Sequence, residues 1–164
     1  MPMGTRRLLG EFRRDWENGI NENNSAIIDN YDHIFADFRN NIMVDKINIF
    51  ILNENYDKTI LVTLDFSNMD TYPFKPPKVK INTTYDYLRI LSTISGKLVE
   101  EKYGLKCMCC NSILCEWGPN YSIQKIIEEC EERLDLKLRS QNINVAHMCV
   151  MKKFGHYLPI AEFL

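Results

Sequence analysis

Cysteine is the residue type whose spacing in this chain most strongly indicates chemistry. Four of the six cysteines fall within nine residues, at Cys107, Cys109, Cys110 and Cys115. In an oxidising environment such crowding is typical of a disulfide framework. In a reducing compartment it indicates a metal site, a nucleophile or small buried side chains. The cysteines by themselves do not choose among these possibilities.

The rest of the chain favours a reducing compartment. No apolar stretch approaches the roughly 18 residues needed to cross a bilayer, and the basic segment 1–15 lacks the apolar region of a signal peptide. We therefore expect a cytoplasmic or nuclear protein with no membrane partner. The formal net charge is −2, without the strongly basic balance of a dedicated nucleic-acid binder, so we expect no nucleic-acid partner either.

The composition is that of one globular domain. Of the 164 residues, 45% are hydrophobic and 26% are charged. A chain of this length buries about two-thirds of its unfolded surface in a core of its own. We predict a single domain over residues 1–164, with its core at about residues 5–135 and a variable tail over residues 136–164.

A zinc site is one interpretation of the clustered cysteines. Cys107 and Cys110 form a Cys-x-x-Cys pair, and His147 with Cys149 completes four ligands by number. His-x-Cys departs from the usual second zinc knuckle, so we predict no metal ion and keep zinc as the alternative. Cys130 and Cys149 fit buried thiols, since cysteine packs as a small apolar residue.

The elements that position the cysteines begin with a helix and a group of strands. The helix has a cap at Thr5 and a stop at Gly19. Its apolar stripe contains Leu8, Leu9, Phe12 and Trp16, and its opposite face carries Arg6, Arg7, Arg13 and Arg14. Strands are predicted over residues 34–38, 42–52, 59–66 and 78–81, the middle two as an antiparallel hairpin. The proline-rich segment 72–77 must leave the sheet.

Helices are predicted on both sides of the cysteines. One short helix falls within residues 84–104. Ser122 caps another, whose inward residues are Ile123, Ile126, Ile127, Cys130 and Leu134. Its glutamates at 128, 129, 131 and 132 are predicted to face solvent, and Pro159 prevents a long helix near the end. The order indicates an α+β domain whose helices cover one face of a single sheet.

Three segments resemble the ubiquitin-conjugating enzymes, and the predicted hairpin lies at the place that the family implies, so that four elements in order cover about residues 5–135. RRLLGEFRRDWE at residues 6–17 is similar to the family's basic first helix. YPFKPPKV at residues 72–79 is similar to its proline loop and following strand, and WGPNYSIQKI at residues 117–126 to its Trp-Ser-Pro turn and helix start. The resemblance implies an N-terminal helix, a four-stranded antiparallel meander and C-terminal helices.

The resemblance also implies an activity and its partners. In the family, a cysteine accepts ubiquitin or a ubiquitin-like protein as a thioester from an activating enzyme, in an ATP-dependent pathway. It then passes the modifier to a substrate lysine, usually with a ubiquitin ligase. This is acyl transfer through a covalent intermediate, which suits a thiolate nucleophile. We predict such a transferase, with no cofactor.

The family's nucleophile precedes the Trp-x-Pro turn, and three cysteines fit that place. Cys110 puts Ile113 and Leu114 on the family's apolar pair, with a shorter loop to Trp117. This fit makes Cys110 the first candidate.

The other two candidates each have one fault. Cys109 has the common spacing to the tryptophan and Met108 before it, but puts Ser112 at a core position. Cys107 also precedes Met108, yet puts Asn111 at an apolar site. We rank them in the order Cys110, Cys109, Cys107.

The partner-facing residues also follow from the resemblance. Phe74 of the proline loop, with Pro119 and Asn120 of the tryptophan turn, is implied to face the ligase. The activating enzyme is implied to meet Arg6, Arg7, Arg13 and Arg14. An apolar side chain on a rigid loop makes a small hot spot, and basic residues steer an acidic partner.

One family motif is missing. The His-Pro-Asn tripeptide has no counterpart between Thr83 and the cysteines, where a longer segment contains neither His nor Asn. Loss of an oxyanion donor slows acyl transfer by about 10² or more, and Asn82, Asn111 or Asn120 are the candidate replacements. The alternative function is a catalytically inactive interaction module, such as the RWD domain with its similar Tyr-Pro-x-x-x-Pro signature, or a zinc-stabilised adaptor.

Overall fold

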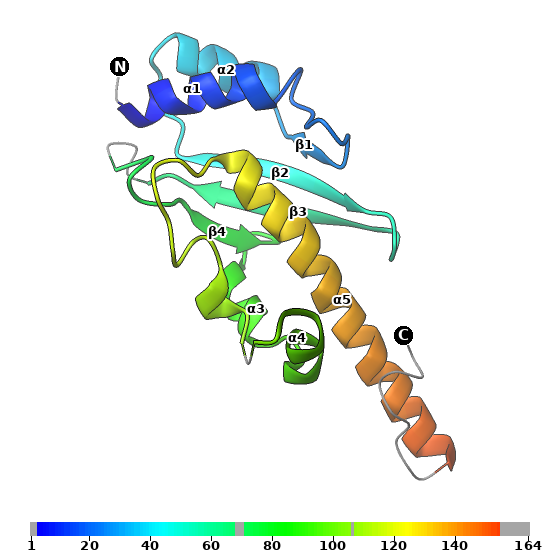
Figure 1. The fold of residues 1–164 in the computed structure, drawn as a ribbon. Helices are drawn as coiled ribbons and strands as arrows, with labels where there is room; N and C mark the ends of the chain where they lie inside the picture. Colours follow the sequence, from blue (N-terminus) through cyan, green and yellow to red (C-terminus); the bar gives the residue numbers. More distant parts are fainter. Residues whose placement is uncertain (1–2, 68–70, 106, 155–164) are drawn as a thin grey trace.

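The protein folds as an α+β domain in which a long helix crosses a twisted antiparallel sheet (Figure 1). The computed structural model describes residues 3–67, 71–105 and 107–154, with side chains up to residue 142. The elements are α1 (Met3–Asp15), β1 (Ala26–Ile28), α2 (Tyr31–Arg39), β2 (Lys46–Asn53), β3 (Lys58–Asp65), β4 (Lys78–Ile81), β5 (Tyr85–Asp86), α3 (Tyr87–Ser92), α4 (Gly96–Tyr103), the 3-10 turn η1 (Cys109–Asn111) and α5 (Ile123–Phe154).

The sheet has five strands in the order β1-β2-β3-β4-β5, every neighbouring pair antiparallel. The predicted hairpin is confirmed, with Ile49 opposite Val62 in its middle. The predicted number of four strands is wrong, because short strands are added at both edges. β1 pairs with β2 through three residues, and β5 pairs with β4 through two.

The strand predicted over residues 34–38 is wrong, because this segment belongs to helix α2. Ile34 and Phe38 lie one turn apart and are both buried. The centroid of the Phe38 ring lies 5.4 Å from that of Phe12 of α1. A five-residue apolar run does not distinguish a strand from a helix. Contact with α1 favours the helix here.

One face of the sheet forms the core with α5. Alternate residues of the central strands, Ile47, Ile49 and Ile51 of β2 with Val62 and Leu64 of β3, are buried. The predicted inward stripe of α5 is confirmed at Ile123, Ile126, Ile127, Cys130 and Leu134. Ser122 accepts a hydrogen bond from the Lys125 amide at 3.4 Å, as expected of the predicted cap. These contacts hold α5 against the central strands of the sheet.

Helix α1 buries its predicted stripe, but its ends differ from the prediction. Leu8, Leu9, Phe12 and Trp16 are all buried. The helix begins at Met3, so Thr5 is a buried residue of the first turn and not the cap. It ends at Asp15, and Gly19, at φ 82°, lies in the turn that follows.

Glu11 of α1 is a buried carboxylate that joins three parts of the chain. It is 1% exposed. It accepts hydrogen bonds from the Tyr72 hydroxyl at 2.7 Å and from the Ile123 amide at 2.9 Å, and Arg7 lies 3.8 Å away. Burial raises the pKa of Glu11, and the bonds from Tyr72 and Ile123 act against that rise. The carboxylate therefore ties the proline loop and the start of α5 to α1.

The segment 84–104 holds two short helices where one was predicted. Asp86 caps α3 by accepting a hydrogen bond from the Arg89 amide at 3.2 Å. Gly104, at φ 68°, ends α4 in the left-handed conformation that glycine adopts without strain.

Helix α5 is longer than the mixed pattern of the tail suggested. It continues to Phe154, over 32 residues, and Pro159 lies outside the described residues. Within the part of the chain that the structure describes, no helix is both long enough and apolar enough to cross a membrane.

We expect Tyr72→Phe to lower the free energy of unfolding by about 1–3 kcal/mol, because the substitution removes a donor from a buried carboxylate. Urea denaturation measures the change. The matched control is Tyr85→Phe, since Tyr85 is 61% exposed. An unchanged midpoint in Tyr72→Phe would contradict the proposed role of the Tyr72 bond in joining α1 to the proline loop.

Candidate functional site

The proline loop and the tryptophan turn, far apart in sequence, meet in the structure. The indole Nε1 of Trp117 donates a hydrogen bond to the carbonyl of Pro73 at 2.7 Å. The half-buried Trp117 ring also lies between Tyr72 and Tyr121, at centroid distances of 6.2 and 5.6 Å. Arg7 adds a hydrogen bond to the Tyr121 carbonyl at 3.1 Å. Two of the segments that carry the family resemblance are therefore in direct contact.

The cysteines lie immediately before this turn, around η1. Cys107 and Cys109 are half-buried, whereas Cys110 and Cys115 are exposed. The Cys107 and Cys109 sulfurs are 2.9 Å apart, and the Cys110 sulfur lies 3.8 Å from that of Cys109. The Cys115 thiol donates to the Cys109 carbonyl at 3.2 Å. All four clustered thiols are thus within reach of a second reactant or of one another.

Cys107 and Cys109 differ in acidity because they share a hydrogen bond. The Cys109 thiol donates to the Cys107 sulfur, which lowers the pKa of Cys107, and the backbone N–H groups of Cys109, Cys110 and Met108 lower it further. The same contact raises the pKa of Cys109 to about 11. Of the two thiols, Cys107 is therefore the one that loses its proton more readily. A thiolate is the nucleophilic form of cysteine.

A buried carboxylate on α5 holds the cysteine segment, and the prediction that Glu129 faces solvent is wrong. Glu129 is 8% exposed. It accepts hydrogen bonds from the Ser112 hydroxyl at 2.7 Å, the Ile113 amide at 2.9 Å and the Tyr87 hydroxyl at 3.0 Å. Glu128 and Glu132 are exposed as predicted, and Glu131 is half-buried.

Arg133 completes this arrangement. It lies one turn after Glu129, with the two charged groups 3.3 Å apart. Its guanidinium donates to the carbonyl of Met108 at 3.2 Å and to that of Asn111 at 3.1 Å. Sequence reasoning missed this pair, although its signal was present: positions 129 and 133 continue the inward stripe from Ile126.

The structure changes the reasons for ranking the three cysteines. Ser112 does occupy a core position and is fully buried, but Glu129 satisfies its hydroxyl, so this fault of Cys109 is removed. Met108 is fully buried as well. Ile113 and Leu114, whose apolar character favoured Cys110, are only half-buried. The lowered pKa of Cys107 favours this residue over Cys109, whose pKa is raised, as the nucleophile.

The residues implied to face a ligase lie on the two joined loops. Phe74 is 61% exposed and follows Pro73, whose carbonyl holds the tryptophan. Pro119 and Asn120 are exposed on the turn after Trp117. The structure therefore brings these residues to neighbouring loops.

The four arginines of α1 have unequal surroundings. Arg7 is half-buried and bonded within the protein, so it takes part in the fold. Arg6, Arg13 and Arg14 are exposed. Arg14 pairs with Asp15 at 2.9 Å, and the Arg13 guanidinium lies 5.9 Å from the centre of the Phe35 ring.

Among the described residues, none of the three candidate asparagines is hydrogen-bonded to a thiol of the cluster. Asn111 is exposed, and its carbonyl accepts a hydrogen bond from Arg133. Asn120 is also exposed, and Asn82 has a φ of 52° in the turn after β4. Within the described part of the chain, the side-chain partners of the clustered thiols are other thiols, and the backbone adds the Cys109 carbonyl and the N–H groups beside Cys107.

No metal centre is formed by the side chains that the structure describes. Nowhere among them do three His, Cys, Asp or Glu residues converge in a metal-binding arrangement. The side chains of His147 and Cys149 lie outside the described residues, so the structure does not test the alternative zinc set.

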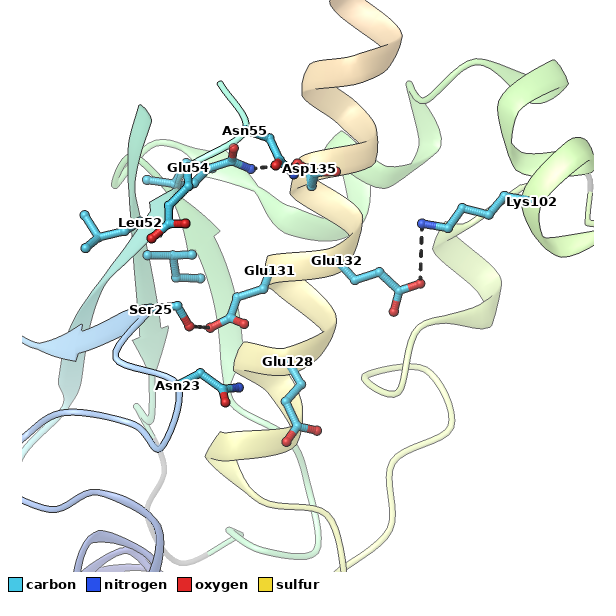
Figure 2. A pocket seen from close by; sticks show the side chains of 13 residues that line it. Asn23, Ser25, Leu52, Glu54, Asn55, Lys102, Glu128, Glu131, Glu132 and Asp135 are labelled. Carbon is cyan, nitrogen blue, oxygen red and sulfur yellow. Dashed lines mark hydrogen bonds and ion pairs between the residues drawn. The ribbon is translucent and has the colours of Figure 1, made fainter. Parts of the chain in front are cut away.

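A hollow of about 520 Å³ lies apart from the cysteines, between α5 and the β2–β3 turn, and no cysteine lines it (Figure 2). Its carboxylates are bonded to their neighbours. Glu131 accepts from Ser25 at 2.7 Å and Asp135 from Asn55 at 2.9 Å, as Figure 2 shows. These bonds tie α5 to the edge of the sheet, which is a structural role.

We expect the two half-buried thiols to react with iodoacetamide over different pH ranges. Cys107 should be alkylated with a midpoint below the ordinary thiol value, and Cys109 only near its raised pKa of about 11. Cys109→Ala removes the donor and should raise the Cys107 midpoint. Tandem mass spectrometry resolves the two sites, and Cys115→Ala is the control. Identical profiles for Cys107 and Cys109 would contradict the shared proton.

No protein-family model, no curated protein and no solved structure matches this chain. The resemblance to the ubiquitin-conjugating enzymes therefore stays a prediction that depends on the three motifs.

Proposed function

We propose that this protein is a cysteine acyl carrier of the ubiquitin-conjugating type. It accepts the C-terminus of ubiquitin or a ubiquitin-like protein as a thioester and passes it to a lysine. The observation that carries the proposal is the pair of Cys107 and Cys109 sulfurs, 2.9 Å apart beside an accessible turn, whose contact lowers the pKa of Cys107 and raises that of Cys109. We place the nucleophile at Cys107.

The chemistry requires two acyl transfers. The Cys107 thiolate attacks the carbonyl carbon of the modifier's thioester on the activating enzyme, and a new carbon–sulfur bond forms. The activating enzyme's sulfur leaves as a thiolate. An amine of the substrate then attacks the same carbonyl carbon, loses its proton to solvent and releases the Cys107 thiolate. ATP is consumed earlier, when the activating enzyme charges the modifier, so this chain needs no nucleotide of its own.

The arrangement of the elements supports the proposal. A basic helix comes first and an antiparallel meander follows, as the resemblance implies. The proline loop meets the tryptophan turn through the bond between Pro73 and Trp117, and the cysteines come directly before that turn. The UBC-like identity of the fold belongs to this proposal.

Partner surfaces follow from the same arrangement. Phe74, with Pro119 and Asn120 on the adjoining turn, forms a small exposed surface suited to a ligase. The exposed Arg6, Arg13 and Arg14 on α1 provide positive charge for an acidic face of the activating enzyme. Arg7 acts in the fold.

A non-catalytic interaction module of the same fold is the second candidate. The observation that favours it is the missing tripeptide, together with the exposed positions of its candidate replacements Asn111 and Asn120 on the described part of the chain. In that case the Phe74 surface would bind a partner and the thiols would take no part.

Thioester formation separates the two candidates. The chain is incubated with an activating enzyme, ATP and ubiquitin or a ubiquitin-like protein, and a thiol-sensitive adduct is sought by non-reducing gel. We expect Cys107→Ala to abolish the adduct and Cys110→Ala to retain it. Cys107→Ser should give a thiol-resistant ester. A known carrier, charged in parallel, establishes that the activating enzyme is competent.

The outcomes are unambiguous. If every modifier fails while the parallel carrier is charged, the carrier proposal is wrong and the interaction module is favoured. If the adduct survives in Cys107→Ala and disappears in Cys109→Ala or Cys110→Ala, the function stands and the nucleophile is reassigned.

We expect Phe74→Ala to reduce ligase-stimulated transfer about tenfold, because it removes an exposed apolar hot spot. The measurement is the ratio of lysine discharge with ligase to discharge without it. Tyr85→Ala is a matched control, since both aromatic rings are 61% exposed. Equal ratios for the two variants would place the ligase contact elsewhere.

A further inference from the structure

We propose that Glu129 and Arg133 of α5 are positioning residues that hold the cysteine segment so that its backbone N–H groups face the sulfur of Cys107. The biological meaning of this inference rests on the proposed function. The geometry on which it depends consists of bonds between α5 and the backbone around η1.

Glu129 fixes the end of the cysteine segment. One carboxylate oxygen accepts from the Ile113 amide at 2.9 Å, and the other accepts from the Ser112 hydroxyl at 2.7 Å and the Tyr87 hydroxyl at 3.0 Å. A carboxylate that is 8% exposed needs such donors, because burial without them is costly. The segment cannot move away from α5 without leaving this carboxylate unsatisfied.

Arg133 fixes the start of η1 and its last residue. Its planar guanidinium donates to the carbonyls of Met108 and Asn111, at 3.2 and 3.1 Å. These carbonyls belong to the residue before η1 and to its last residue, so the fork spans the turn. A guanidinium reaches two carbonyls at once because its donors are held in a fixed plane.

The Met108 carbonyl connects the Arg133 guanidinium to the backbone beside the Cys107 sulfur. The carbonyl of Met108 and the N–H of Cys109 belong to the same peptide group, which is planar and holds them on opposite sides. Arg133 grips the carbonyl, and the N–H on the other side is one of those that lower the pKa of Cys107. The direction of that N–H therefore depends on Arg133, which Glu129 pairs with at 3.3 Å.

The segment that replaces the family's tripeptide takes part in this arrangement. Tyr87 is the first residue of α3, within the longer stretch between β4 and the cysteines, and it is fully buried. Its hydroxyl donates to Glu129. The long segment thus supplies a donor to the carboxylate that holds the cysteine turn, in place of an amide on the turn itself.

Few titratable groups surround the Cys107 sulfur within the described residues. The Cys109 thiol is in direct contact, and the Cys110 thiol lies behind it, 3.8 Å from Cys109. Glu129 faces Tyr87 and Arg133, with Cys130 beside it on α5. Glu129 bonds to the Ser112 hydroxyl and the Ile113 amide, so the proposed influence on Cys107 passes through the backbone of the cysteine segment.

Glu129→Gln distinguishes positioning from a direct effect of charge. Glutamine keeps only one accepting oxygen, so it cannot accept from the Ile113 amide and from both hydroxyls at once, and it loses the charge that pairs with Arg133. If Glu129 positions the turn, the Cys107 thiolate loses its N–H donors and becomes less favourable, which raises the alkylation midpoint. Removal of a negative charge acting directly would lower that midpoint. The two explanations predict opposite signs.

The experiment measures the pH profile of Cys107 alkylation by iodoacetamide in the full chain, read by tandem mass spectrometry. We expect Glu129→Gln to raise the Cys107 midpoint by about one pH unit, a tenfold loss of thiolate well below the midpoint. Arg133→Lys keeps the charge but loses the fork, and should shift the midpoint in the same direction. Glu132→Gln is the matched control, because Glu132 is an exposed carboxylate on the same helix.

Thermal unfolding of each variant shows whether it is folded. Should Glu129→Gln not fold, Arg133→Lys and Tyr87→Phe decide, and each should raise the midpoint. If Glu129→Gln folds and its Cys107 alkylation midpoint is unchanged or lowered, the proposal is overturned. If Glu129→Gln does not fold, an unchanged or lowered midpoint in both Arg133→Lys and Tyr87→Phe overturns it. The readout is alkylation, so a chain that forms no thioester but shows the expected shifts refutes the carrier function and leaves the positioning role standing.

Discussion

The structure depends on one constraint: a carboxylate buried in a protein must receive hydrogen bonds. Glu11 of α1 meets it by accepting from Tyr72 of the proline loop and from the first amide of α5. Glu129 meets it further along α5, with donors from α3 and from the cysteine segment. Each carboxylate joins segments that lie far apart in the sequence and belong to different elements. Together they attach α1, the proline loop and the cysteine turn to α5, which itself packs on the sheet.

This constraint also accounts for the chemistry of the cysteines. A surface loop with a 3-10 turn has little packing of its own to fix the direction of its peptide groups. Arg133 and Glu129 provide that order from a rigid helix, and the N–H groups of the turn then favour the Cys107 thiolate. The contact between the two sulfurs also raises the pKa of Cys109, so the two half-buried thiols differ in acidity. A polar network in the core and a reactive thiol near the surface are therefore parts of one arrangement.

Local patterns in the sequence were sufficient for the elements whose apolar spacing is long and regular. The hairpin, the buried stripe of α1 and the inward stripe of α5 follow from periods of 2 and 3.6 residues, and the structure has them as predicted. The prediction failed for residues 34–38, a run too short to distinguish the two periods. It also failed for Glu129, because a glutamate on an apolar stripe is buried only if distant donors meet it.

The sequence by itself determined the class of the fold, the clustering of the cysteines and the two motifs on either side of them, because these depend on residue type and on short-range spacing. It also placed Trp117 directly after the cysteines. Only the tertiary structure decided that Trp117 bonds to Pro73, which thiol of the cluster is the acidic one, and that Glu129 points inward. Each of these depends on the direction of a hydrogen bond or on the exclusion of water, and both are set by residues distant along the chain.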